Sequence, residues 1–311
     1  MNATQVLKTT AGYLWRAPLC ASAYVVGAMG GGALVAALGM PLPEIPEQAN
    51  AQIMGRLLFV ASFALAMGLA PLARRIQGAY WQRWLMLAAL CYVCLGVTTP
   101  LEAAIFTTLG GMASIPVVTA MPCLLFAAVM ALLFKPAERG DSFLTNATRF
   151  FQDRGTREWA WRFGAAICAF PVIYWTFGMM VAPFVIEYYR QGQFGLTAPN
   201  AGVIVLAQLV RSSLFLAGTL PILIMWSGSR RQLVAALGVA FYVLVGLFGM
   251  IQGYWLAPTL QILHNTELFA DSVVYALVLS LLLVKTKTRE TDDSRLGLPT
   301  WAGHVQPGVV N

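Results

Sequence analysis

The stretch that decides the fold is VIVLAQLVRSSLFLAGTLPILIMW, residues 203–226. An α-helix needs about 20 apolar residues to cross roughly 30 Å of hydrocarbon. This stretch is long enough, and Arg211 is its single charged residue. A charge at the centre of a membrane-spanning helix costs about 2.5 kcal/mol or more. The stretch therefore predicts a transmembrane helix and raises the question of which group lies against Arg211.

The composition of the whole chain agrees with a membrane protein. Of its 311 residues, 59% are hydrophobic and 11% are charged, whereas a soluble domain has about 25% charged residues. A chain this apolar cannot cover its surface with polar side chains, so its solvent is expected to be lipid. The five cysteines all lie in apolar stretches, which argues against a disulfide framework.

Eight apolar stretches are long enough to span a membrane. They are 17–40, 53–73, 84–106, 112–134, 163–186, 203–226, 232–255 and 268–285. The first is longer than the apolar core of a signal peptide, which has about 7–15 residues, so we expect it to be retained. The sequence therefore predicts an all-α, polytopic integral membrane protein with eight transmembrane helices.

The distribution of charge predicts the orientation of these helices. If the N-terminus is cytoplasmic, nearly all of the 20 Lys and Arg residues fall on the cytoplasmic side, and most acidic residues outside the middle loop and the tail fall on the other side. This bias is the positive-inside rule. It predicts a protein of the cytoplasmic (inner) membrane with both termini in the cytoplasm. The net charge of +7 is then a topological signal, and no nucleic-acid partner is expected.

The spans and loops divide the chain into four segments. We predict an N-terminal four-helix half (1–134), a basic cytoplasmic loop (135–162), a C-terminal four-helix half (163–285) and a disordered cytoplasmic tail (286–311). The basic loop interleaves aromatic residues with arginines, which is typical of an interfacial helix on anionic inner-leaflet lipids. An ordinary linker with one amphipathic turn is the alternative.

A parallel duplication of the two halves is a further interpretation. Four spans in each half give both halves the same orientation in the membrane. The motif CYVCLG (91–96) resembles FYVLVG (241–246), and Arg56 and Arg211 stand at similar distances before an arginine pair. Membrane helices resemble one another in composition, however, so these similarities leave the duplication open.

The last span supplies candidate partners for Arg211. His264, Glu267 and Asp271 are spaced by three and four residues, which places them on one helical face if the helix begins that early. We therefore expect Arg211 to face the bundle and to form an ion pair with Asp271 or Glu267. A polar cavity open to the outer side is the second interpretation, and both can hold together. Simple snorkelling of the arginine is the third.

The outer end of the fifth span supplies further candidates for such a cavity. The motif EYYRQG begins there with Glu187, Tyr188 and Tyr189. For the two tyrosines the alternative is the aromatic belt found at membrane interfaces. Glu102, near the outer end of the third span, is interpreted as a solvated helix end.

Most other chemistry is disfavoured by the sequence. The chain has two histidines, and His304 belongs to the predicted cytoplasmic tail on the opposite side from His264, so neither a metal site nor another cofactor is expected. Cys91 and Cys94 have the spacing of a redox pair but lie inside an apolar span, where thiolates are disfavoured. The Gly-x-x-x-Gly spacing in GAMGGG (27–32) is typical of close helix packing.

Three functions fit these observations. The favoured one is a transporter or lipid-handling permease with a polar site in the outer leaflet, where Arg211 binds an anionic small molecule or headgroup. The second is a membrane-embedded enzyme that acts on a lipid or an extracytoplasmic substrate with His264 as general base. The third is a non-catalytic subunit or assembly factor with a partner subunit or a second copy of the chain. The sequence identifies no substrate.

Overall fold

The computed structural model describes residues 3–42, 44, 48–136 and 140–285, with side chains from residue 11 onward. All regular structure in this part of the chain is helical. The predicted disordered tail, 286–311, lies outside the described residues.

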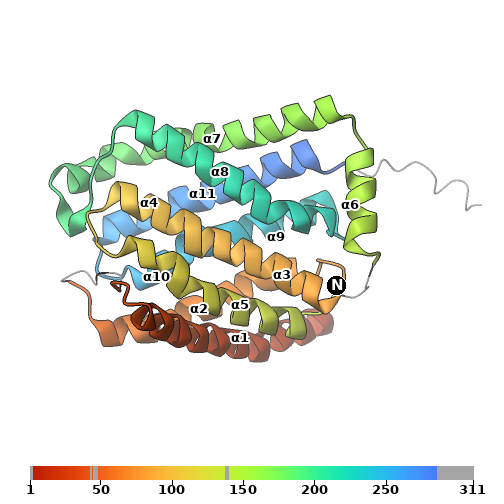
Figure 1. The fold of residues 1–311 in the computed structure, drawn as a ribbon, viewed down its shortest axis with the longest axis horizontal. Coiled ribbons are helices and arrows are strands. Elements are labelled where there is room, and N and C mark those ends of the chain that lie inside the picture. Colours follow the sequence, from red (N-terminus) through yellow and green to blue (C-terminus); the bar gives the residue numbers. More distant parts are fainter. Residues whose placement is uncertain (1–2, 43, 45–47, 137–139, 286–311) are drawn as a thin grey trace, which may run out of the picture.

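Within these described residues, eight elements are long and apolar enough to cross a membrane, which confirms the predicted fold class. They are α1 (Ala3–Ala37), α2 (Ala51–Ala73), α3 (Tyr80–Cys91) with α4 (Thr99–Phe106), α5 (Ile115–Leu133), α7 (Thr156–Arg190), α8 (Ala201–Ile224), α9 (Arg230–Tyr242) with α10 (Phe248–Gln252), and α11 (Pro258–Leu283). They lie side by side in one bundle, with the described start of α1 and end of α11 at the same end (Figure 1).

Helix ends follow from local sequence. Asn50 caps α2 by accepting hydrogen bonds from the backbone N–H groups of Gln52 and Ile53, and Asn200 caps α8 in the same way. Helix α11 begins at Pro258, about three turns before the predicted start of its span, because proline is favoured in the first turn. This early start brings His264 and Glu267 into the helix.

The third and seventh spans each contain a π-helical segment. The first, η1 (Tyr92–Thr98), joins α3 to α4, and the second, η4 (Val243–Leu247), joins α9 to α10. In η1 the hydroxyl of Thr98 donates to the carbonyl of Cys94, which gives this carbonyl of the widened turn a hydrogen-bond partner. A π-helical turn adds a residue and rotates every side chain beyond it. Both segments overlap the similar motifs noted in the sequence.

The two halves repeat at a constant offset of 150 residues. Without gaps, this offset aligns segment 50–135 with segment 200–285. Identical pairs in this register include Asn50 and Asn200, Ser62 and Ser212, Gly68 and Gly218, Pro71 and Pro221, Gly78 and Gly228, Gln82 and Gln232, Tyr92 and Tyr242, Gly96 and Gly246, and Lys135 and Lys285. In this register Arg211 corresponds to Ala61 and not to Arg56. The offset favours the duplication suggested by the sequence.

Contacts between the halves repeat with the same offset. The backbone N–H of Gln77 donates to the carbonyl of Met225 at 3.0 Å, and that of Ser227 donates to the carbonyl of Arg75 at 3.1 Å. These two hydrogen bonds are equivalent because each residue is 150 positions from its counterpart. They indicate an approximate two-fold axis that passes between the loops after α2 and α8.

The glycines of α2 and α8 make equivalent contacts inside the bundle, again related by the offset of 150 residues. A Cβ on Gly68 would lie 2.6 Å from Cγ1 of Val243, so α2 packs closely against η4. A Cβ on Gly218 would lie 3.5 Å from Cβ of Val93, so α8 packs against η1 in the equivalent way. Small residues allow such close approach of membrane helices.

Helix α6 (Phe143–Gln152) joins the halves and runs across the end of the bundle, roughly perpendicular to the spans (Figure 1). The predicted basic loop is thus partly helical, and its last residues already belong to α7, which begins at Thr156. The end that carries α6 is called the predicted cytoplasmic end. The opposite end, with residues 38–42 and 48–50 and loops 107–111, 191–200 and 253–257, is called the predicted outer end.

Candidate functional site

Arg211 lies near the middle of α8 and points into the bundle, with 1% of its surface exposed. Its guanidinium carbon lies 5.6 Å from the ring centroid of Phe215 and 5.7 Å from that of Phe170. These rings shield the charge from lipid and attract it through their π faces. The expected bundle-facing position of Arg211 is therefore what the structure shows.

The ionic partner of Arg211 is Glu102 of α4. Nη1 of Arg211 lies 2.7 Å from Oε1 of Glu102 and donates to Oε1 of Gln208 at 3.0 Å. The Glu102 side chain is 19% exposed, so this pair is largely withdrawn from solvent. It joins the first half of the chain to the second.

The predicted pairing of Arg211 with Asp271 or Glu267 is therefore wrong, and so is the interpretation of Glu102 as a solvated helix end. The physical reason lies in the third span. Because η1 is π-helical, it rotates α4 relative to a regular helix. Glu102, one turn from the end of α4, then faces α8 and the side chain of Arg211.

His264 and Glu267 meet on one face of α11, as their spacing predicts. Nδ1 of His264 lies 3.1 Å from Oε2 of Glu267. Glu267 is buried, whereas His264 is partly exposed, so the imidazole is the more accessible member of the pair. The carboxylate fixes the orientation of the ring through Nδ1 and leaves Nε2 free for another partner.

Asp271 is the deepest carboxylate of α11. It is 3% exposed, and neither of its carboxylate oxygens has a hydrogen-bond partner among the described residues. It lies within electrostatic range of Glu267, Glu102, Arg211 and His264. A buried polar group without a hydrogen-bond partner costs free energy. Packing alone therefore does not explain a carboxylate at this position.

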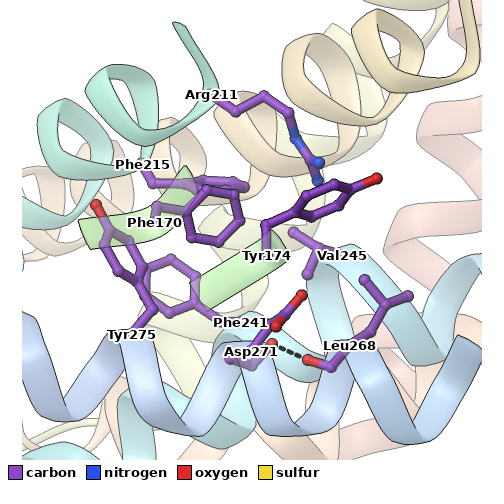
Figure 2. Close-up of a pocket in the computed structure, with 10 residues that line it drawn as sticks. Phe170, Tyr174, Arg211, Phe215, Phe241, Val245, Leu268, Asp271 and Tyr275 are labelled. Carbon is purple, nitrogen blue, oxygen red and sulfur yellow. Dashed lines mark hydrogen bonds between the residues drawn. The ribbon is translucent and has the colours of Figure 1, made fainter. Parts of the chain in front are cut away.

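A small cavity separates Asp271 from Arg211. Figure 2 shows Asp271 pointing from α11 toward this cavity, with the ring of Tyr174 and the side chain of Arg211 on the far side. Its volume is about 10 Å³, which is close to the space that one water molecule needs. Its other walls are the aromatic rings of Phe170, Phe215, Phe241 and Tyr275 together with Val245, Leu268 and Ser272.

A larger cavity of about 270 Å³ opens nearer the predicted outer end, between α7, α8 and α11. Its polar lining consists of Tyr174, Tyr189, His264 and Glu267, and its other walls are mainly apolar. Tyr174 lines both cavities and therefore connects them. We call the larger one the outer cavity.

Three of the predicted residues, Tyr189, His264 and Glu267, thus meet in the outer cavity. Glu187 and Tyr188 do not line it, because their positions in α7 turn them away from Tyr189. Glu187 forms an exposed ion pair with Arg190 at 2.8 Å. The Tyr188 ring lies 6.4 Å from that of Phe194 in the following loop.

Sequence reasoning missed Tyr174 and Gln208, since neither interrupts its apolar stretch with a charge. The internal repeat offers a signal that could have shown where the site lies. At the offset of 150, four titratable residues of the site in the second half have small or apolar counterparts in the first. Arg211, His264, Glu267 and Asp271 correspond to Ala61, Ser114, Val117 and Met121. These four members of the site therefore have no titratable counterpart in the first half.

In the part of the chain that the structure describes, no group of three or more His, Cys, Asp or Glu residues could hold a metal ion. Cys91 and Cys94 are buried free thiols in the core, in keeping with their interpretation as packing residues. Comparisons with family models, curated proteins and solved structures give no match.

Proposed function

We propose that this multi-pass membrane protein is a carrier that takes its substrate into the outer cavity and couples its movement to a proton. The observation that supports this most is the buried chain of titratable groups along one path. His264 and Glu267 line the outer cavity, and Asp271 lies deeper, across the small cavity from Arg211. Ionisable groups inside a membrane are costly and typically mark substrate or proton paths.

The arrangement of the two halves also supports a carrier. Parallel repeats related by an axis along the membrane normal occur in several transporter folds, where the substrate site lies between the repeats. Glu102 belongs to the first half and Arg211 to the second, so their ion pair crosses this boundary. A movement of one half against the other would have to break or re-form it.

Asp271 is the candidate for the coupling proton. Its carboxylate oxygens face a cavity with room for about one water molecule and have no hydrogen-bond partner among the residues described. A carboxyl group in this position can accept a proton from such a water and release it when the surroundings change. Tyr174, which lines both cavities, supplies a hydroxyl between Asp271 and the outer cavity.

The outer cavity favours a hydrophobic cation as substrate. Its walls carry the aromatic residues Phe106, Tyr174, Trp175 and Tyr189 together with the carboxylate of Glu267. Aromatic faces and a carboxylate are the groups that bind organic cations. Arg211 is paired with Glu102 and does not line this cavity. The anionic ligand predicted from the sequence therefore has no arginine partner among the described residues that line the outer cavity, and we propose a cation instead.

Proteoliposomes with an imposed pH gradient test the proposal. The probes are tetraphenylphosphonium and ethidium as hydrophobic cations and benzoate as an anion. We expect gradient-dependent uptake of a cation that Glu267→Gln reduces at least about tenfold. Glu187→Gln is the matched control, because Glu187 is exposed and outside the cavity. Uptake of benzoate alone would overturn the cationic class, and uptake of no probe would contradict the carrier.

A steric variant gives an independent check on the cavity. A Cβ on Gly178 would lie 3.3 Å from Oε1 of Glu267, so Gly178→Leu places a side chain in the cavity beside the carboxylate. Gly164 is on the same helix with nothing within 4 Å of its Cβ position, so Gly164→Leu is the control. We expect Gly178→Leu to abolish uptake and Gly164→Leu to retain it.

A lipid-acting enzyme is the second candidate, and the His264–Glu267 pair supports it. A histidine oriented by a carboxylate is a common general base. It predicts that the purified protein consumes a lipid from mixed phospholipid vesicles with no gradient present, and that His264→Ala stops this. Mass spectrometry of the lipids separates the two functions, because a carrier leaves the lipid composition unchanged.

A further inference from the structure

A pocket of about 360 Å³ lies at the predicted cytoplasmic end, and it shares no lining residue with the outer cavity. Its walls are Trp15 and Arg16 of α1, Arg74 after α2, and Leu132, Leu133 and Lys135 at the end of α5. Three of these six side chains are cationic, and none is acidic. We call it the basic pocket.

Aromatic rings hold the arginines of the basic pocket without neutralising them. The Arg16 guanidinium lies 5.1 Å from the ring centroid of Trp15 and 5.7 Å from that of Phe134. Arg74 lies 5.6 Å from the ring of Tyr13 and donates to its hydroxyl at 3.2 Å. These contacts orient the cations but leave their charge in place.

No carboxylate of the described residues lies within salt-bridge distance of Arg16, Arg74 or Lys135. In addition, the Nε–H of Arg16 is buried and has no hydrogen-bond partner in the described part of the chain. A buried donor on a charged group is costly to leave unpaired. The pocket therefore presents positive charge and an unused donor to whatever enters it.

The second half of the chain contains a basic cluster whose arginines have an acidic partner within the protein. Around the end of α11, Arg154 and Arg162 donate to the carbonyls of Leu283 and Leu282, and both form ion pairs with Glu158, at 3.3 and 2.9 Å. There the protein provides its own carboxylate.

The lysines that follow the last span of each half give the most direct comparison. Lys285 pairs with Asp153 at 3.7 Å, whereas Lys135, its counterpart at the offset of 150, has no such partner among the described side chains. Within the described residues, this position thus has an acidic partner in the second half and none in the first.

We propose that the basic pocket binds the phosphate group of an anionic phospholipid of the cytoplasmic leaflet. Clustered Lys and Arg side chains between helices at this side of a membrane suit a phosphate headgroup, and guanidinium groups bind its oxygens in pairs. Trp15 and Leu132 are 54% and 53% exposed beside the cations, and they offer an apolar surface for the acyl chains. The inference does not depend on the proposed carrier function.

The first experiment measures lipid retention by native mass spectrometry of the purified protein in mixed micelles. The probes are phosphatidylglycerol, phosphatidylcholine and inorganic phosphate. We expect selective retention of phosphatidylglycerol. Replacing Arg16, Arg74 and Lys135 together by Gln should weaken it about 100-fold, since each basic residue near a membrane surface contributes about fivefold.

The matched control removes three charges from the same end outside the pocket, with Arg75, Arg157 and Arg231 replaced by Gln. These side chains are exposed and do not line the pocket. We expect the control to retain the lipid within about twofold of the wild-type protein. Equal losses in both triple variants would overturn the site and leave only a general charge effect.

A pair of less disruptive variants keeps the proposal testable if the triple variant does not fold. Arg74 and Lys135 are exposed, so Arg74→Gln and Lys135→Gln should leave packing intact. Each should weaken phosphatidylglycerol retention about fivefold. Unchanged retention in both would overturn the proposal. Displacement of the lipid by millimolar inorganic phosphate would assign the pocket to free phosphate and overturn the lipid source.

Discussion

The guanidinium of Arg211 lies 2.7 Å from the carboxylate of Glu102, and this contact joins the two halves of the chain inside the membrane. Its two members have unlike counterparts in the internal repeat, since Ala61 stands where Arg211 would be and Gln252 stands where Glu102 would be. The ion pair is therefore a feature that breaks the symmetry of the two halves.

Loss of one member of this pair should destabilise the protein more than loss of both. Glu102→Gln leaves the buried guanidinium without a counter-charge and should lower the free energy of unfolding by about 3 kcal/mol. Replacing both residues by Met removes the desolvated charges and should recover most of that loss. Unfolding in mixed micelles measures both. Equal destabilisation by the single and double variants would show that the two residues are not coupled.

The exposed pair of Glu187 and Arg190 serves as the control for that cycle. Both side chains are mostly exposed, at 62% and 66%. Such surface pairs contribute about 0–1 kcal/mol, so Glu187→Gln should change the unfolding free energy little.

Asp271→Asn should separate function from stability. The carboxylate has no hydrogen bond to lose within the described structure, so the free energy of unfolding should change by less than about 1 kcal/mol. The coupling of uptake to a pH gradient should disappear, because an amide carries no exchangeable acid proton at this position. Uptake with and without a gradient measures the coupling, and retained coupling in this variant would remove Asp271 from the proton path.

The neighbouring Ser272 gives the matched control for Asp271. Its hydroxyl donates to the carbonyl of Leu268 at 2.6 Å and the residue is equally buried. Ser272→Ala should cost about 1 kcal/mol of stability and leave coupling unchanged. Asp271→Asn should thus change coupling but not stability, whereas Ser272→Ala should change stability but not coupling.

Adjacent glycines of α1 should respond very differently to a methyl group. A Cβ on Gly31 would collide with the backbone carbonyl of Val118 in α5, whereas Gly32 has nothing within 4 Å. Gly31→Ala should therefore lower the unfolding free energy by about 1–3 kcal/mol. Gly32→Ala should be neutral or stabilise by up to about 1 kcal/mol. Similar effects of the two changes would contradict the close packing of α1 on α5.

The orientation of the bundle can be tested with single cysteines in intact cells. Gln191 is exposed at the predicted outer end and Ser227 at the predicted cytoplasmic end. With Cys168 replaced by Ser, Gln191→Cys should react with a membrane-impermeant maleimide from outside. Ser227→Cys should react only after permeabilisation. The reverse pattern would invert the topology and move the basic pocket to the outer face.

The spans were predictable because they depend on local properties of the sequence. Apolar length and loop charge need no knowledge of packing, and the His264–Glu267 pair follows from spacing within one helix. The partner of Arg211 was not predictable in this way. It depends on the rotation of α4 after a π-helical segment, and the sequence shows no local signal of that rotation.

The antiparallel bridge between Ile76 and Trp226 has a mechanical consequence. The hydrogen bonds on either side of it are made by backbone groups, so few side-chain changes can loosen them. They fasten the two halves together at one membrane face. At the opposite face the bridge between Thr107 and Leu196 fastens them in the same way, again through backbone hydrogen bonds. Any parting of the halves beside the outer cavity, which Phe106 lines, would therefore have to break this second junction.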